Sequence, residues 1–263
     1  MNTLVPPDDS MDRRSFIHSA SALAAAGFAQ KSLGGMIRPE RIRAIAFDGF
    51  AIFDATAVIA VADTIVPGRG REVVTAWRSQ LFQYQWLRTL GGRYVDFERT
   101  AADSLDFVVK PLKLALTPED RDRLLAAQLS LTPWADAPRA IGELRDAGVR
   151  LCFLSNMTEH MLDAGARRGG FREQFEFVLS TDRVRAAKPD PRAYQMAIDS
   201  FRLPKSEIAF VAFAGWDAAG ASWFGYPTLW LNKSSAPAER LDATPALVSS
   251  SLADVVEFVK QSK

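Results

Sequence analysis

The stretch IRAIAFDGF (residues 42–50) begins with an apolar run and breaks at an aspartate followed by a glycine. Such a run is typical of a strand that is buried in a parallel sheet. Asp48 would then lie at the carboxyl end of the strand, where open α/β folds place their reactive groups. A carboxylate in that position is a candidate nucleophile.

Three polar fragments further along the chain could meet Asp48. They are LSN (154–156), AKPDP (187–191) and AGWD (214–217), and each follows or lies near an apolar, strand-like run. The carboxyl ends of parallel strands share one edge of a sheet, so we expect these fragments to gather there. This ordered set is the main indication of function in the sequence.

Size and charge narrow the classes of function. The chain has 263 residues, of which 48% are apolar, enough for one large core or for one core with a smaller insert. Its 32 basic and 31 acidic residues leave a net charge of +1, with no long run of either sign. The electrostatic pattern of a nucleic-acid-binding protein is therefore missing, and we expect a folded enzyme with a small-molecule substrate and no nucleic-acid partner.

Histidine and cysteine usage narrows the chemistry. The two histidines are His18 and His160, so a catalytic triad would depend on His160 alone, and zinc lacks ligands. The single cysteine, Cys152, lies in the apolar run VRLCFL (149–154), which suits a buried small side chain better than a nucleophile. Carboxylate and lysine chemistry remain, and we expect no metal and no cofactor.

The N-terminal segment predicts export. RRSFIH (13–18) precedes an alanine-rich stretch at 19–29, which resembles a twin-arginine signal and is too short to span a bilayer. We expect residues 1–35 to be a leader and the mature protein to lie in the periplasm, with no stable membrane span. If translation starts at Met36 instead, the protein is cytoplasmic.

Strand-like and helix-like segments alternate from residue 42, which predicts an α/β fold with a Rossmann-like, doubly wound parallel sheet. Strands are expected at 43–47, 150–154, 177–179, 208–212 and 228–231. Helices without intervening strands are expected between the first two strands, at 55–66, 71–90, 97–112 and 118–131. We assign 36–55 and 135–263 to the core, and 56–134 to a helical cap that would exclude water from the site.

The ordered fragments resemble the haloacid dehalogenase superfamily and, within it, the type II L-2-haloacid dehalogenases. The resemblance covers about residues 42–260. It rests on AFD (46–48), PGRGRE (67–72), AWR (76–78), YQWLR (84–88), GRY (92–94), LSN (154–156), KPD (188–190), Tyr194, WDA (216–218) and FGYPT (224–228).

The resemblance implies a displacement reaction. Asp48 would attack C2 of a short 2-haloalkanoate, expel halide with inversion and form an ester, from which water releases the 2-hydroxy acid. Lys188 would favour the ionised form of the nucleophile, and Arg78 would bind the departing halide. Asp217 matches the acid linked to the hydrolytic water.

The resemblance also implies a set of substrate-binding residues and a possible homodimer. Phe82, Phe97 and Trp216 match an apolar wall around the halide. Ser155 and Asn156 match the positions that hold the substrate carboxylate. Phe50 and Tyr194 complete the candidate binding residues.

Two motifs depart from the family pattern. DGFAIFD (48–54) is one residue shorter than usual and lacks a threonine. AFA (212–214) replaces Ser-Ser-Asn, so Ala212 and Ala214 lack a hydroxyl and an amide. The loss of such a hydrogen bond commonly costs about 100-fold in rate where it acts on the transition state.

Two alternative functions remain open, one from the residues that the superfamily shares and one from these departures. A phosphatase of the same superfamily would use the same aspartate, serine and lysine. It usually carries a second aspartate two positions after the nucleophile, where this chain has Phe50. The other alternative is a catalytically attenuated or silent periplasmic binding protein with the same fold.

Overall fold

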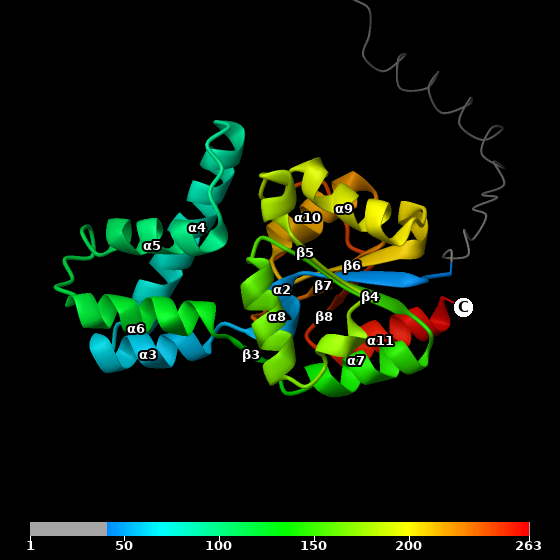
Figure 1. Ribbon diagram of the computed structural model, residues 1–263, viewed down its shortest axis with the longest axis horizontal. Coiled ribbons are helices and arrows are strands. Elements are labelled where there is room, and N and C mark those ends of the chain that lie inside the picture. Colours follow the sequence, from blue (N-terminus) through cyan, green and yellow to red (C-terminus); the bar gives the residue numbers. More distant parts are fainter. Residues whose placement is uncertain (1–40, 263) are drawn as a thin grey trace, which may run out of the picture. The chain divides into compact units, whose positions relative to one another are not determined.

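The computed structural model describes residues 41–262, in which a six-stranded parallel sheet forms the core (Figure 1). The strand order is β5-β4-β1-β6-β7-β8. The bounds are β1 Ala44–Phe47, β4 Arg150–Ser155, β5 Phe177–Ser180, β6 Ile208–Ala212, β7 Thr228–Leu231 and β8 Leu247–Ser249. The five predicted strands and the doubly wound α/β class are confirmed, and β8 is an additional edge strand. The predicted leader lies outside the described residues.

The central strand β1 is buried on both faces, as its sequence predicts. Ile45 and Phe47 point into one hydrophobic cluster, whereas Ala44 and Ala46 point into another on the opposite face. Alternate residues of a strand face opposite sides, so a strand covered on both sides must be apolar throughout.

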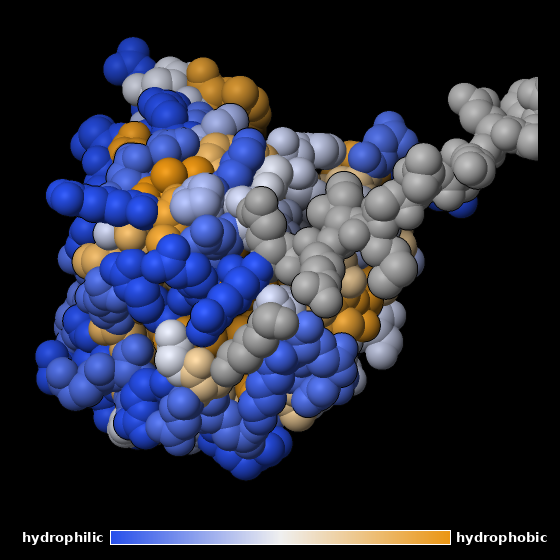
Figure 2. All heavy atoms as spheres, turned by 90° about the vertical axis from the view of Figure 1, so that its right-hand side faces the viewer, coloured by the Kyte–Doolittle hydropathy of each residue, from blue (hydrophilic) through white to orange (hydrophobic). Residues whose placement is uncertain are grey.

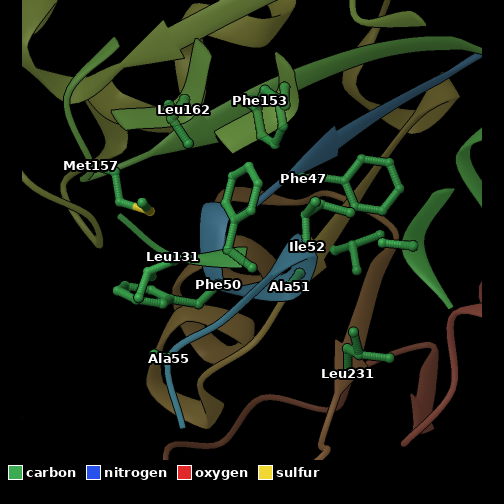
Figure 3. Close-up of a cluster of buried hydrophobic side chains, with 14 of the residues drawn as sticks. Phe47, Phe50, Ala51, Ile52, Ala55, Leu131, Phe153, Met157, Leu162 and Leu231 are labelled. Carbon is green, nitrogen blue, oxygen red and sulfur yellow. The ribbon is translucent and has the colours of Figure 1, made fainter. Parts of the chain in front are cut away.

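Helices cover the two faces of the sheet. The first cluster takes apolar side chains from α7 (Ala137–Asp146), α8 (Glu159–Arg168) and α11 (Leu252–Gln261). The second takes them from α9 (Pro191–Phe201) and α10 (Gly215–Phe224). Short 3-10 turns lie at Arg172–Gln174, Thr181–Val184 and Lys205–Glu207. Figure 3 shows part of the first cluster, around the short helix α2 (Gly49–Ile52).

Four helices are inserted between β1 and β4. They are α3 (Ala57–Ile65), α4 (Gly70–Leu90), α5 (Phe97–Val108) and α6 (Pro118–Leu129). α4 packs against α3 and α5, and the buried Trp77 of α4 donates a hydrogen bond from Nε1 to the Ala101 carbonyl at 2.8 Å. A capping box of Thr117 and Asp120 begins α6. We call residues 57–129 the helical insert.

The expectation that residues 56–134 contain no strand is wrong. β2 (Phe53–Asp54) pairs antiparallel with β3 (Thr132–Pro133), and β3 lies within that range. Two-residue strands are too short to produce a detectable period-2 pattern. The third insert helix also ends four residues earlier than predicted, because turns around Pro111 and the left-handed Lys113 replace its last turn.

The surface of the described part is mixed in polarity. The face in Figure 2 is mostly hydrophilic, with hydrophobic residues in small groups. Among residues 41–262, no helix is both long enough and apolar enough to cross a membrane.

Candidate active site

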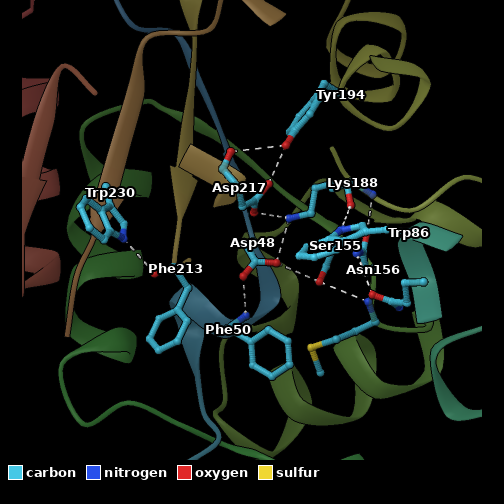
Figure 4. A network of polar contacts seen from close by, with 12 residues as sticks. Asp48, Phe50, Trp86, Ser155, Asn156, Lys188, Tyr194, Phe213, Asp217 and Trp230 are labelled. Carbon is cyan, nitrogen blue, oxygen red and sulfur yellow. Dashed lines mark hydrogen bonds and ion pairs between the residues drawn. The ribbon is translucent and has the colours of Figure 1, made fainter. Parts of the chain in front are cut away.

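The ends of three neighbouring strands bring the polar fragments together. Phe47, the last residue of β1, is in register with Phe153 of β4 and Val211 of β6. The residues that follow therefore leave the sheet at one edge. Asp48 lies there beside Ser155 and Lys188, as predicted from the sequence (Figure 4).

Asp48 is buried and fixed by three donors. Its Oδ1 accepts hydrogen bonds from Ser155 Oγ at 3.2 Å and Lys188 Nζ at 2.9 Å. Its Oδ2 accepts one from the Phe50 backbone N–H at 3.1 Å, which makes Asp48 the N-cap of α2. These donors hold the carboxylate in one orientation, which suits a nucleophile that must attack from a fixed position.

Gly49 allows Ser155 to approach Asp48 closely. A Cβ at residue 49 would lie 2.5 Å from Met157 Sδ and 2.9 Å from Ser155 Oγ. Both distances are shorter than real Cβ contacts, so any side chain would displace the serine from the carboxylate. The Asp-Gly pair that ends the first strand is thus needed for packing at the site.

Lys188 joins two carboxylates in the interior. Its Nζ donates to Asp48 Oδ1 at 2.9 Å and to Asp217 Oδ2 at 2.6 Å, and the whole residue is 1% exposed. Tyr194 donates its hydroxyl proton to the other Asp217 oxygen, Oδ1, at 2.7 Å. The order Asp48, Lys188, Asp217, Tyr194 forms one continuous chain of charged and polar groups.

Burial and charge act against each other on this chain. Burial lowers the pKa of Lys188, but the charges of Asp217 and Asp48 outweigh it, so the net pKa is raised and the ammonium form is favoured. Burial raises the pKa of Asp217 to about 6, with the nearby ammonium of Lys188 opposing and the charge of Asp48 adding to the rise. Asp217 is therefore a stronger base than an ordinary aspartate.

Arg78 of α4 supplies a cation on the other side of the site. Its Nη2 donates to the Ala55 carbonyl at 3.3 Å, and its Cζ lies 6.0 Å from the centre of the Phe50 ring. Burial lowers the pKa of Arg78, and the charge of Asp54 opposes this. Arg78 Nε is buried and has no hydrogen-bond partner among the described residues. A buried, unpaired guanidinium N–H can bind an anion.

Asp48 and Arg78 line the same cavity of about 60 Å³. Its aromatic wall is compact, with ring centres of Phe82 and Trp216 5.2 Å apart and those of Phe50 and Phe82 6.3 Å apart. The lining residues are Asp48, Phe50, Arg78, Phe82, Asn156, Lys188, Phe213, Ala214, Trp216 and Asp217. Such a space suits a very small molecule with an apolar part and a negative charge.

Three predicted site residues lie behind the cavity lining, and all three are fully buried. Ser155 contacts Asp48 through its hydroxyl. Phe97 packs against Phe50, with ring centres 6.2 Å apart. Tyr194 contacts Asp217. The structure therefore brings these residues to groups of the site, and their roles toward a substrate stay predictions.

Phe213 and Ala214 line the cavity, although they were not among the predicted binding residues. The sequence feature that could have identified them is their position directly after β6, because the end of that strand was expected at the site. Phe213 stacks on Trp134, and Trp230 donates to its carbonyl from Nε1 at 3.0 Å. The segment 212–214, in which the sequence departs from the family pattern, thus contributes a phenyl ring to the cavity.

The site offers little for a metal ion. Between residues 41 and 262, no three His, Cys, Asp or Glu side chains are grouped so that they could hold one. Asp48 and Asp217 are instead joined through the Lys188 ammonium.

Comparisons with known proteins agree on one family. A family model described as haloacid dehalogenase-like hydrolase matches residues 22–225. The (S)-2-haloacid dehalogenase of Pseudomonas sp. (strain YL) is 39% identical over 218 residues, which are 82% of this chain and 94% of that protein. The family-model match includes the strand that precedes Asp48.

Solved structures agree as well. One L-2-haloacid dehalogenase superimposes with a TM-score of 0.81 at 33% identity, covering 83% of this chain and 99% of that one. The L-2-haloacid dehalogenase from Xanthobacter autotrophicus, with chloropropionic acid covalently bound, gives a TM-score of 0.75 at 28% identity, covering 83% and 98%.

Proposed function

The chain belongs to the haloacid dehalogenase-like hydrolase family, and from this premise we propose that it hydrolyses short 2-haloalkanoic acids to 2-hydroxy acids through an ester on Asp48. One observation carries the proposal. The Asp48 carboxylate, bonded to Lys188, faces the same small cavity as the buried guanidinium of Arg78. A nucleophile and an anion site on one cavity are what a halide displacement requires.

In the first step, an Asp48 oxygen attacks C2 of the substrate as the carbon–halogen bond breaks. The electron pair of that bond leaves with the halide, and the charge develops near Arg78, whose unpaired Nε–H can stabilise it. The cavity restricts the substrate to a short chain and keeps water away from the carboxylate.

In the second step, water attacks the carbonyl carbon of the Asp48 ester. Asp217 accepts the water proton, because its raised pKa makes its ionised form a good base. Esterification removes the charge of Asp48, which had helped to raise that pKa, so Asp217 stays ionised while the ester is present. When the acyl–oxygen bond breaks, the leaving alkoxide takes the proton from Asp217 and departs as the 2-hydroxy acid. The restored Asp48 carboxyl loses the second water proton to solvent and is again a carboxylate.

Phe50 argues against phosphatase activity. It stands two positions after Asp48, where a phosphatase of the superfamily needs a carboxylic acid, and it is 7% exposed within an aromatic cluster. Its ring forms an apolar wall instead, which suits the carbon chain of a haloacid better than a phosphate group.

Halide release tests the proposal. Purified protein with L-2-chloropropionate should release chloride without added metal, whereas the Asp48→Asn variant should release none. In a single turnover in ¹⁸O-labelled water, the Asp48 carboxylate should acquire the label, because water attacks its carbonyl carbon. No halide release by the unaltered chain refutes the proposal and favours the silent binding protein. Label found only in the product shows direct attack by water and refutes the ester on Asp48.

The helical insert serves as a cap in this proposal. Its helix α4 brings Arg78 and Phe82 to the cavity, while Asp48 reaches it from the end of β1 and Asp217 from helix α10. Substrate entry then requires that the insert and the sheet separate at this cavity.

Location and assembly are further parts of the proposal. The twin-arginine fragment at 13–18 supports export to the periplasm, and cell fractionation with an Arg13→Lys, Arg14→Lys variant tests it. Exposed apolar side chains on α4 and α5, Leu87, Leu90 and Phe107, support a homodimer. Sedimentation equilibrium tests the homodimer, and a monomer at micromolar concentration contradicts it.

A further inference from the structure

The backbone around Lys188 is held from the helical insert by side chains of α4. Trp86 Nε1 donates to the Lys188 carbonyl at 3.2 Å, and the Ala187 N–H donates to Thr89 Oγ1 at 3.0 Å. Gln85 acts through Asn156, as described below. We call Gln85, Trp86 and Thr89 the α4 clamp.

Asn156 links Gln85 to Lys188, and the donors fix the orientation of both amides. The Lys188 N–H donates to Asn156 Oδ1 at 2.9 Å, so the other end of that amide is an NH₂ group. This NH₂ group donates to Gln85 Oε1 at 3.0 Å. Gln85 is 4% exposed, so it serves this buried contact rather than the solvent.

The clamp lies on the same face of α4 as the cavity residues of that helix. Arg78, Phe82, Gln85 and Thr89 are spaced by four, three and four residues, which places them along one stripe of a helix. The stripe therefore contacts the cavity at Arg78 and Phe82. Thr89 contacts the segment that carries Lys188, and Gln85 reaches that segment through Asn156.

From this geometry we propose that Gln85, with Trp86 and Thr89, positions Lys188 for catalysis, so that the lysine is correctly placed only when α4 is seated on the sheet. The inference rests on the proposed function, because it assigns these residues to that reaction. Lys188 Nζ bonds both Asp48 and Asp217, so a shift of its backbone disturbs nucleophile and base together. Small displacements of reacting groups can cost about 100-fold in rate.

Gln85→Met is the main test variant, because it keeps the length of the side chain and removes the oxygen that accepts the hydrogen bond from Asn156. We expect kcat for halide release to fall roughly 10- to 100-fold, with a smaller change in KM. Gln85→Glu keeps an acceptor oxygen and should be at least about tenfold more active than Gln85→Met. Equal activity of these two variants overturns the inference.

Matched controls separate positioning from general loosening. Gln83→Met makes the same change at an exposed position of α4 and should leave kcat unchanged. Tyr94→Phe removes a 2.6 Å bond from the insert to Asp182, which contacts neither Lys188 nor Asn156 through this bond, and should also leave kcat unchanged. If Tyr94→Phe reduces kcat as much as Gln85→Met does, loosening of the insert explains the effect and the inference fails.

Amide hydrogen exchange tests the clamp independently of activity. In Gln85→Met, the Lys188 amide hydrogen should exchange about tenfold faster than in the unaltered chain. In Thr89→Val, the Ala187 amide hydrogen should exchange faster by a similar factor. The amide hydrogens of β6 should keep their exchange rates in both variants. Unchanged exchange at both amides overturns the inference whatever the activity. If the unaltered chain releases no halide, the proposed function fails, and the catalytic role of the clamp fails with it even where exchange accelerates.

Discussion

Replacing Lys188 by methionine should strongly destabilise the protein. Methionine retains much of the apolar stem but removes the ammonium that bonds Asp48 and Asp217 at 2.9 and 2.6 Å. Two buried carboxylates then face each other without a counter-charge. Removing one partner of a buried ion pair costs about 3–5 kcal/mol in the free energy of unfolding. For a domain of this size, we expect the melting temperature to fall by about 6–20 °C.

The loss of stability in Lys188→Met should be larger at neutral pH than at acidic pH. Without Lys188, which lowers the pKa of Asp217, that pKa rises further above its unfolded value. A carboxyl group whose pKa is higher in the folded than in the unfolded protein stabilises the fold when it is protonated. Its contribution to the free energy of unfolding is complete at low pH and is lost as pH rises through the folded-state pKa. The difference between Lys188→Met and the unaltered chain should therefore shrink between pH 7.5 and pH 5.

Urea unfolding followed by circular dichroism at both pH values measures the difference. The Lys188→Met, Asp217→Asn double variant should recover part of the loss at pH 7.5, because one of the two like charges is gone. Lys260→Met is the matched control, since it breaks an exposed ion pair with Glu143 and should cost at most about 1 kcal/mol. A Lys188→Met variant as stable as the unaltered chain at pH 7.5, or a deficit independent of pH, refutes the reasoning.

Further predictions concern activity and the end of β6. Ester hydrolysis requires ionised Asp217, so its rate is full above the pKa of Asp217 in the ester and falls about tenfold per pH unit below it. That pKa lies below the value of about 6 in the free protein, because the esterified Asp48 carries no charge. Tyr194→Phe should shift this fall in rate to higher pH, because the hydrogen bond from Tyr194 lowers the pKa of Asp217. A fall in rate at lower or unchanged pH contradicts the assignment of Asp217 as the base. Phe213→Ala should raise kcat/KM for 2-chlorobutanoate relative to chloroacetate by roughly tenfold, because it enlarges the cavity. Ala214 is the N-cap of α10 and makes no side-chain cap bond. Ala214→Asn should therefore add about 1 kcal/mol to the free energy of unfolding and raise kcat. An unchanged urea midpoint and an unchanged rate would show that the missing amide does not limit this protein.

The parallel strands were predictable because burial on two faces requires a continuous apolar run. β1 and β6 are buried at every position, and both are recognisable in the sequence. β8 was missed because it has three residues, none fully buried, in a polar context. The β2–β3 pair was missed because two residues carry no period. Local sequence therefore predicts the interior strands and fails at the short pairs and the sheet edge.

The charged groups of the site were predictable because they follow strand ends that must converge. Asp48 and Lys188 meet as expected although they lie 140 residues apart. The direction of supporting side chains was not predictable, since Ser155 could have faced either the substrate or the nucleophile. Gln85 was missed because a glutamine on a helix rich in polar residues is usually solvated, and its partner Asn156 is 71 residues away.

The burial of Cys152 makes the protein convenient for chemical labelling. The residue is the only cysteine of the chain, lies within β4 with no exposed surface, and burial raises the pKa of its thiol well above the ordinary value. Maleimide reagents need an accessible thiolate, so the native fold should stay unmodified. A single cysteine engineered at an exposed position would then take a fluorophore or spin label at one site, and movement of the insert could be followed without removing the native residue.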